Sequence, residues 1–121
     1  MSNFTPGKNI AMKVPTHEYE ATIKFYRETL GFRDLTPEGE SDCRFDFGGK
    51  VLWIDCVSTI SQAEIWLEVN CRDPLDQAAA ELEALNVTRC DEIEPLPDGY
   101  PGFWIKSPGN IVHLVTKQAA S

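Results

Sequence analysis

The sequence contains the same order of predicted elements twice. Residues 10–14 alternate between apolar and polar side chains, as in a half-buried strand, and residues 19–30 place apolar side chains at helical spacing. The same two patterns return at residues 64–69 and 75–85. Further strand-like runs follow each helix, at residues 32–35, 43–47 and 51–57 in the first half and 87–90, 103–106 and 111–116 in the second. Each half therefore reads strand, helix and three strands.

Regular offsets between the halves support a duplication. Ile10 corresponds to Ile65 and Gly31 to Asn86, both 55 residues apart, and residues 51–54 correspond to 111–114 at an offset of 60. Gly31 and Asn86 each follow a helix, where a left-handed residue is favoured. The sequence predicts an α+β fold in which two tandem βαβββ modules, at about residues 8–57 and 62–117, pair into a curved mixed sheet around a cavity. We expect residues 1–121 to form a single domain.

The charge balance excludes some classes of partner. Nineteen acidic residues against 11 basic ones give a formal net charge of −8, whereas nucleic acids and anionic membranes require a basic surface. The sequence has no apolar run near the ~18 residues of a membrane span, and its N-terminus lacks the basic and apolar regions of a signal peptide. We expect a cytoplasmic protein that binds neither nucleic acid nor membranes.

The four cysteines are Cys43, Cys56, Cys71 and Cys90, and they are widely spaced. Without a C-x-x-C pair, the sequence supports neither a zinc knuckle nor a thioredoxin-type motif. We expect free thiols that mostly pack as small core residues.

Strand alternation assigns one face of each strand to the helix of its module. The apolar faces comprise Ile10, Met12 and Val14; Leu52, Ile54 and Cys56; Ile65, Leu67 and Val69; and Val112 and Leu114. The opposite faces comprise Asn9, Ala11 and Lys13; Val51, Trp53 and Asp55; Glu64, Trp66 and Glu68; and Ile111, His113 and Val115. Tryptophan side chains favour a surface sheltered from water, whereas charged side chains need contact with water. A partly hydrated cavity lined by both kinds of residue satisfies both requirements. The alternative is a solvated sheet face with the tryptophans in a core or an interface.

Two motifs resemble the vicinal oxygen chelate superfamily, which contains glyoxalase I, bleomycin-resistance proteins and extradiol dioxygenases. "IKFYRETLGF" (Ile23 to Phe32) resembles the superfamily's helix ending in F-Y-x-x-x-L-G-F. "SPGNIVHLV" (Ser107 to Val115) resembles its closing strand D-P-x-G-N-x-x-E-L, with serine for aspartate and a turn one residue shorter. The resemblance runs from about Asn9 to Thr116. It implies a glyoxalase-like domain and a homodimer.

Members similar to glyoxalase I hold a divalent metal with four side chains, and the resemblance implies matching positions in this sequence. The matching positions here are Asn9, Trp53, Glu64 and His113. Glu64 and His113 are candidate ligands, Asn9 is a weak oxygen donor and Trp53 cannot coordinate, whereas a catalytic metal wants about three protein ligands. The other histidine, His17, is expected to be exposed in the first turn of a helix. No cofactor is predicted, and the alternative is one divalent Ni, Zn, Mn or Fe ion.

Two functions remain open. The first is a small-molecule binding protein without the complete metal site, in which Trp53 and Trp66 stack on a planar or cationic ligand. The second is an isomerase, lyase or dioxygenase acting on a small oxygenated substrate, either assisted by a metal or with Glu64 and His113 as an acid–base pair. Trp104 belongs to a loop, residues 97–104, that is expected to rim the cavity; the alternative is that its aromatic side chains form core or dimer contacts. The candidate ligand-binding residues are Asn9, Lys13, Trp53, Asp55, Trp66, Glu68 and Trp104.

Overall fold

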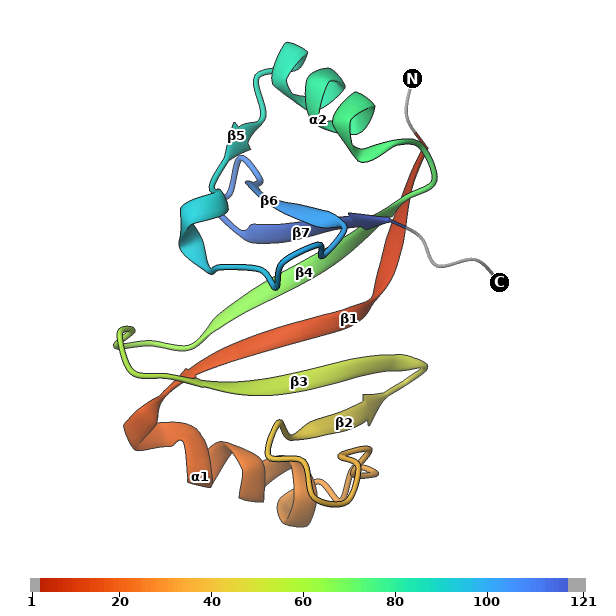
Figure 1. Ribbon diagram of the computed structural model, residues 1–121. Coiled ribbons are helices and arrows are strands. Elements are labelled where there is room, and N and C mark those ends of the chain that lie inside the picture. The colour runs from red at the N-terminus through yellow and green to blue at the C-terminus, as the bar shows by residue number, and fades with distance from the viewer. Residues whose placement is uncertain (1–2, 118–121) are drawn as a thin grey trace. The chain divides into compact units, whose positions relative to one another are not determined.

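The computed structural model describes residues 3–117 (Figure 1). Seven strands form one open mixed sheet in the order β2–β3–β1–β4–β7–β6–β5. The strands are β1 (Phe4–Pro15), β2 (Arg44–Phe47), β3 (Lys50–Val57), β4 (Glu64–Cys71), β5 (Thr88–Arg89), β6 (Gly102–Lys106) and β7 (Val112–Lys117). The helices are α1 (Thr16–Lys24), continued by the π-helical turn η1 (Phe25–Thr29), α2 (Leu75–Ala84) and the 3-10 turn η2 (Asp91–Ile93). The predicted α+β class with a mixed sheet is confirmed.

The chain divides into two compact units. One comprises residues 8–66, and the other combines the residues through Gly7 with those from Leu67 onward. In each unit the first and last long strands of a module pair in parallel, β1 with β3 and β4 with β7. The remaining pairs, β2 with β3, β6 with β7 and β5 with β6, are antiparallel. The single-domain interpretation stays a prediction.

Two predicted helix ends are confirmed, and one predicted strand is wrong. Gly31 has a φ of 68° and Asn86 a φ of 64°, so both adopt the left-handed backbone expected after a helix. Residues 32–35 do not form a strand, and only Asp34 forms an isolated bridge, to Phe45. The Asp34 carboxylate accepts a hydrogen bond from the Thr36 backbone N–H at 2.8 Å. Backbone bonds of 2.9 Å from Leu35 to Arg44 and from Asp46 to Arg33 pair the segment with β2 over this single bridge, and the local bond to Thr36 ends the pairing.

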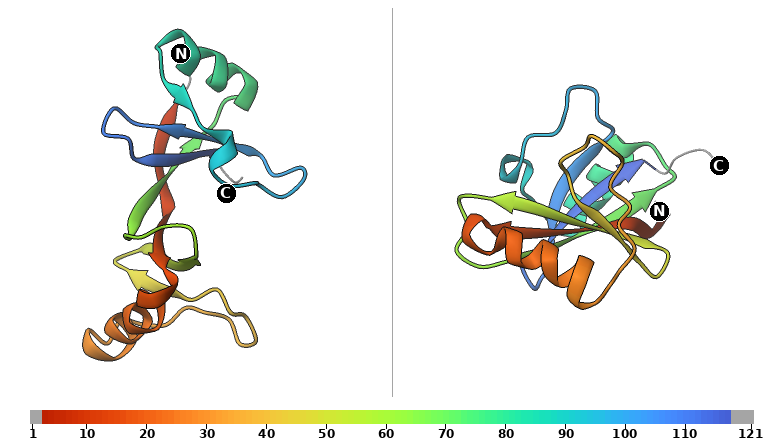
Figure 2. Two further views of the ribbon diagram at one scale, coloured as in Figure 1. Left: turned by 90° about the vertical axis from the view of Figure 1, so that its left-hand side faces the viewer. Right: turned by 90° about the horizontal axis from the view of Figure 1, so that it is seen from below.

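In the unit formed by residues 8–66, α1 packs on β3 and covers one face of the strands (Figures 1 and 2). The core beneath it comprises Val14, Ile23, Phe45, Leu52 and Ile54, with Ile10, Met12 and Tyr19 packed against them. The faces predicted for β1 and β3 are thus confirmed up to Ile54. Cys56, predicted on the same apolar face, is exposed because it lies at the end of β3, beside the start of α1.

In the other unit, α2 packs on a core of Cys71, Ala78, Phe103 and Val115, together with Val69. Val69 confirms the predicted helix-facing side of β4, but Ile65 and Leu67 are exposed at 38% each. Val115 was predicted on the side away from the helix, and this prediction is wrong. The difference also changes the position of His113, as described below.

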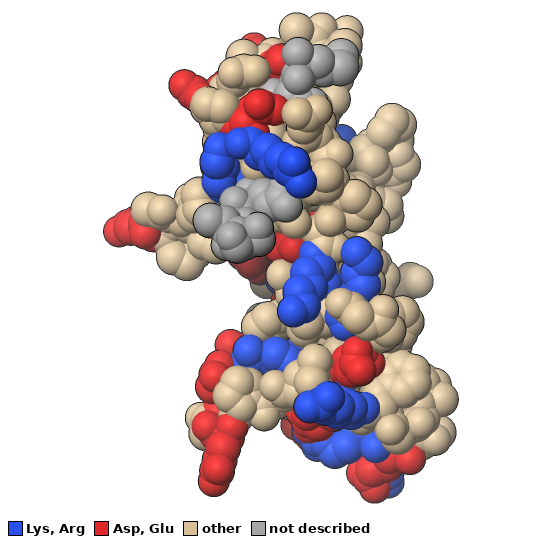
Figure 3. Space-filling model, turned by 90° about the vertical axis from the view of Figure 1, so that its right-hand side faces the viewer, with Lys and Arg blue, Asp and Glu red and all other residues tan. Residues whose placement is uncertain are grey.

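No helix in residues 3–117 is long and apolar enough to cross a membrane. On the face drawn in Figure 3, Lys and Arg side chains lie in separate groups with Asp and Glu side chains nearby.

Candidate functional site

Asn9 and Trp53, two of the positions that the resemblance assigns to a metal, are bonded to each other. They lie on neighbouring strands, since Asn9 pairs with Val51 and Ala11 with Trp53 in the parallel register of β1 and β3. The indole N–H of Trp53 donates a hydrogen bond to the side-chain oxygen of Asn9 at 2.8 Å. The Asn9 side-chain oxygen therefore accepts a hydrogen bond from the indole N–H, a group that can only donate hydrogen bonds.

Lys13 lies further along the same face, in contact with Asp55 and Trp66. Its register partner on β3 is Asp55, and the ammonium nitrogen of Lys13 is 2.8 Å from a carboxylate oxygen of Asp55. The same nitrogen lies 4.3 Å from the ring centroid of Trp66. Lys13 is 5% exposed and Trp66 is 8% exposed. A buried ammonium requires such partners, and an indole face attracts a cation. The structure thus brings together three predicted residues in one ion-pair and ring contact.

Arg44 belongs to this face and was missed by the sequence analysis. It pairs with Trp53 in the register of β2 and β3, and its guanidinium carbon lies 4.0 Å from the centroid of the Trp53 ring. A 2.8 Å salt bridge to Glu40 holds the guanidinium. The alternation of β2 contained the signal, because Phe45 belongs to the α1 core and its neighbours must point to the opposite side.

Each tryptophan of this unit therefore carries a cation of the protein on its ring. Lys13 occupies this position at Trp66, and Arg44 occupies it at Trp53. The predicted stacking of a cationic ligand on these rings has to compete with side chains already in contact. A neutral or anionic planar ligand carries no positive charge that would compete with Lys13 or Arg44 for these rings.

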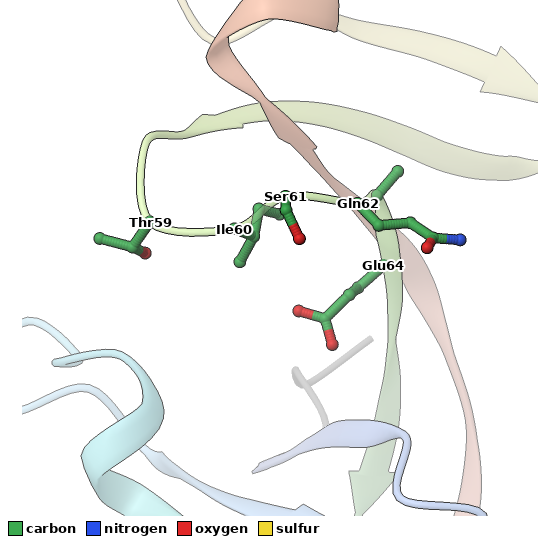
Figure 4. A pocket seen from close by; sticks show the side chains of 6 residues that line it. Thr59, Ile60, Ser61, Gln62 and Glu64 are labelled. Atoms are coloured by element: carbon green, nitrogen blue, oxygen red, sulfur yellow. The ribbon is translucent and has the colours of Figure 1, made fainter.

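Glu64 is exposed at the start of β4. It lines a recess of about 430 Å³ together with the preceding loop, residues 59–63. Figure 4 shows the Glu64 carboxylate projecting on the same side as the Thr59–Ser61 part of the loop, with the Gln62 amide directed elsewhere. The recess is lined mostly by polar side chains, together with Ile60 and Ala63, and all of them belong to the 8–66 unit.

Glu68 and Trp104 share a face of the other unit. Glu68 pairs with Leu114, and Leu114 pairs with Trp104, so the three side chains lie in register across β4, β7 and β6. Trp104 is buried, and its indole N–H donates to the backbone oxygen of Glu94 at 2.9 Å. Its backbone N–H donates to the Asp91 carboxylate at 3.0 Å. These bonds anchor the η2 segment to β6.

His113 faces the α2 side of its sheet, which corrects the predicted orientation. It pairs with Leu67 on β4 and Ile105 on β6. Alternation places it on the face of Val115, which packs against α2. Its Nδ1 lies 2.9 Å from the backbone oxygen of Ile111.

The reason for this correction is a one-residue difference in offset. Met12 pairs with Ile54, and its counterpart 55 residues later, Leu67, pairs with His113. His113 therefore corresponds to Ile54 at an offset of 59, not to Trp53 at an offset of 60. The turn before β7 is one residue shorter than the motif it resembles, and a shift of one residue moves a strand's side chains to the opposite face. The predicted pairing of Glu64 with His113, which belong to different units, stays a prediction.

The residues present do not fit the metal of glyoxalase-like proteins. The Asn9 side chain accepts a hydrogen bond from Trp53, and the Trp53 indole cannot coordinate a metal. Glu64 is exposed, and His113 lies on the α2 face. Within residues 3–117, no three His, Cys, Asp or Glu side chains are grouped so that they could hold a metal ion. His17 is exposed, as predicted, and its Nε2 lies 3.7 Å from Glu18.

Similarity to known proteins is found in structure and not in sequence. No protein-family profile and no curated protein sequence matches the chain. A Mn(II)-bound glyoxalase from Novosphingobium aromaticivorans superposes with a TM-score of 0.68 at 18% identity, over 99% of this chain and 41% of that chain. A glyoxalase/bleomycin resistance protein/dioxygenase superfamily member from Vibrio splendidus 12B01 superposes with a TM-score of 0.56 at 10% identity, over 90% and 97%.

Homoprotocatechuate 2,3-dioxygenase from Brevibacterium fuscum superposes with a TM-score of 0.62 at 14% identity, over 98% of this chain and 38% of that chain. The chain thus spans less than half the length of this dioxygenase and of the Novosphingobium glyoxalase. The order of strands, the parallel pairing within each module and these superpositions lead to one conclusion: the chain has the fold of the vicinal oxygen chelate superfamily.

Proposed function

We propose that the chain is a small-molecule binding protein that does not use the metal of its glyoxalase-like structural neighbours. The observation that carries the proposal is the 2.8 Å hydrogen bond from Trp53 to Asn9. It joins two positions that the resemblance assigns to metal ligands, and it engages the side-chain oxygen of Asn9. A site built in this way binds organic groups by contact and hydrogen bonding.

The surroundings of Trp53 support a planar ligand. Asn9 holds the edge of the indole and Arg44 covers a face of its ring, so this half-buried side chain is fixed before a ligand arrives. Preorganised aromatic side chains bind at a lower entropic cost than mobile ones. Arg44 also provides a positive charge beside the ring, which favours an aromatic carboxylate over an aromatic cation. The Brevibacterium dioxygenase has been solved in complex with 3,4-dihydroxyphenylacetate, an aromatic carboxylate.

The homodimer and the cytoplasmic location expected from the sequence are part of this proposal. So are ligand contacts by Lys13, Asp55, Trp66, Glu68 and Trp104. The alternative, an enzyme in which Glu64 and His113 exchange a proton with the substrate, also stays a prediction. This alternative predicts that the protein turns over a bound compound and that the turnover is lost in both Glu64→Gln and His113→Asn.

Tryptophan fluorescence tests the proposal directly. The full chain is titrated with 3,4-dihydroxyphenylacetate and with a cationic aromatic amine of similar size, each in the presence and absence of a chelator. We expect saturable quenching by the carboxylate, unchanged by the chelator, and weaker quenching by the amine. Quenching that disappears with the chelator would show that binding depends on a metal and would overturn the proposal.

A matched pair of variants locates the binding. Arg44 lies over Trp53 and forms a salt bridge with Glu40, whereas Arg89 lies 4.5 Å from the centroid of Phe103 and forms a salt bridge with Asp91. Arg44→Gln is expected to weaken binding of the carboxylate about tenfold, the loss of one charge-assisted hydrogen bond. Arg89→Gln is expected to leave it unchanged. Equal effects of the two variants would contradict a site at Trp53.

A further inference from the structure

Two of the four cysteines lie side by side on the α1 face of the 8–66 unit. The Ile54 backbone N–H donates to the Cys43 oxygen at 3.0 Å, which continues the antiparallel register of β2 and β3 and places Cys43 opposite Ile54. Cys56 follows Ile54 by two residues and shares its face. Cys43 and Cys56 are therefore diagonal neighbours across two strands.

Both sulfurs have polar surroundings. A guanidinium nitrogen of Arg27 lies 3.9 Å from the sulfur of Cys43, and the Cys56 sulfur lies 3.7 Å from the hydroxyl of Thr16. Cys43 is half-buried and Cys56 is exposed, so solvent reaches this pair. Reactive cysteines typically occupy partly exposed positions beside a cationic side chain.

Tyr19 shows that the two sulfurs also adjoin one hydroxyl group. The pKa of Tyr19 is raised to about 12, first by burial and then by the hydrogen bond with Cys43 and the charges of Cys43 and Cys56. A single phenol oxygen is thus close enough to both thiols to be influenced by each. The remaining cysteines differ, because Cys71 and Cys90 are buried and burial raises the pKa of the Cys90 thiol.

We propose that Cys43 and Cys56 form a modification site that closes into a disulfide when the protein meets hydrogen peroxide. The Cys43 sulfur, beside Arg27, attacks one peroxide oxygen, the O–O bond breaks, and the products are a sulfenic acid and water. The Cys56 sulfur then attacks the sulfenic sulfur, the S–O bond breaks, and the hydroxide leaves with the thiol proton as a second water. Two thiols are oxidised by two electrons, and one hydrogen peroxide is reduced to two waters.

The position of the pair predicts that this disulfide is easily reduced. Diagonal neighbours across an antiparallel pair have Cα atoms about 7–8 Å apart, whereas disulfides rarely exceed about 6.8 Å. Cys43 lies just before β2 begins and its carbonyl accepts a hydrogen bond from Ile54, so closing the disulfide requires this end of the pairing to shift. The remaining strain favours the reduced form and places the disulfide among the labile, reversible ones.

Peptide mass spectrometry without reductant tests the site. The reduced full chain is treated with hydrogen peroxide, blocked with an alkylating reagent and digested. We expect a Cys43–Cys56 crosslink within one chain, formed before any modification of Cys71 or Cys90 and reversed by dithiothreitol. A crosslink between two chains, or oxidation at equal rates of all four cysteines, would overturn the proposal.

Single serine variants test the order of the two steps. Cys56→Ser is expected to accumulate a sulfenic acid at Cys43 that dimedone traps, and Cys43→Ser is expected to slow the oxidation of Cys56 at least tenfold. Cys71→Ser is the matched control and should form the crosslink as the parent does. Rapid dimedone labelling of Cys56 in Cys43→Ser would contradict the assignment of Cys43 as the attacking thiol. The outcome is independent of the proposed ligand binding, since no step requires a ligand.

Discussion

The Trp53 indole N–H and the Asn9 side-chain oxygen, on neighbouring parallel strands, are joined by a 2.8 Å hydrogen bond. The bond fixes both side chains on the face of the sheet opposite the α1 core. It predicts that the two residues contribute to stability together. Trp53→Phe removes the indole N–H that donates to the Asn9 oxygen. We expect this change to lower the free energy of unfolding by about 1–2 kcal/mol.

Urea denaturation of Trp53→Phe, Asn9→Ala and the double variant measures this coupling. Because both single changes break the same bond, the double variant should lose less stability than the sum of the two. Strictly additive losses would mean that the bond contributes nothing to folding.

The Lys13–Asp55 pair predicts a larger effect. Asp55→Asn leaves the buried ammonium of Lys13 without its carboxylate, and breaking a fully buried pair costs about 3–5 kcal/mol. The side chain of Asp55 is 29% exposed, so solvent replaces part of the interaction. We expect a loss of roughly 1–3 kcal/mol in urea denaturation. Lys13→Met in the same background should recover part of the loss, because it removes the buried charge, and failure to recover any would contradict this explanation.

Gly31 offers a test of backbone conformation alone. Its φ of 68° is costly for alanine, yet an added Cβ would meet no atom within 4 Å. Gly31→Ala is therefore expected to destabilise the protein by about 1 kcal/mol through its backbone only. Gly109→Ala, at a glycine outside the left-handed region, serves as the control and should change the thermal midpoint much less. A larger effect at Gly109 than at Gly31 would be inconsistent with the observed dihedral angles.

The sequence predicted the first module better than the second. Alternation on β1 and β3 assigned Val14, Leu52 and Ile54 to the core because the polar residues Asn9, Lys13 and Asp55 mark the opposite face. In β7 the run Ile111 to Val115 is apolar on both sides of His113, so alternation could not choose a face. Similar residue types at 51–54 and 111–114 suggested an offset of 60 between the modules. The register of β7 with β4 shows that the offset is 59.

The candidate site was predicted in composition but not in its contacts. Asn9, Lys13, Trp53, Asp55 and Trp66 were all assigned to one face, and the structure joins them in pairs across β1, β3 and β4. Sequence patterns gave no indication that Lys13 lies over Trp66 rather than facing a ligand, since such contacts depend on side-chain direction. Arg44 was missed because the faces of β2 had not been assigned.

The raised pKa of Tyr19 predicts a loss of stability at high pH. The unfolded chain releases the phenol proton near pH 10, whereas the folded protein retains it to about pH 12. The folded state therefore binds more protons in this range, and its stability is fully present below pH 10 and decreases as the pH rises from 10 to about 12. Tyr19→Phe, compared with the parent by urea denaturation under reducing conditions, should show a smaller decrease across this range. An identical decrease in both proteins would exclude Tyr19 as its cause.

Binding of Mn(II) tests the central claim most directly, because a similar glyoxalase is known in its Mn(II)-bound form. The chelator-treated full chain is titrated with Mn(II), and the free ion is followed by electron paramagnetic resonance. With Asn9 bonded to Trp53, we predict no saturable binding at micromolar Mn(II) and no change in the thermal midpoint. Binding of one equivalent per chain that is lost in both Asn9→Ala and Glu64→Ala would show that these residues form a metal site and would contradict the account.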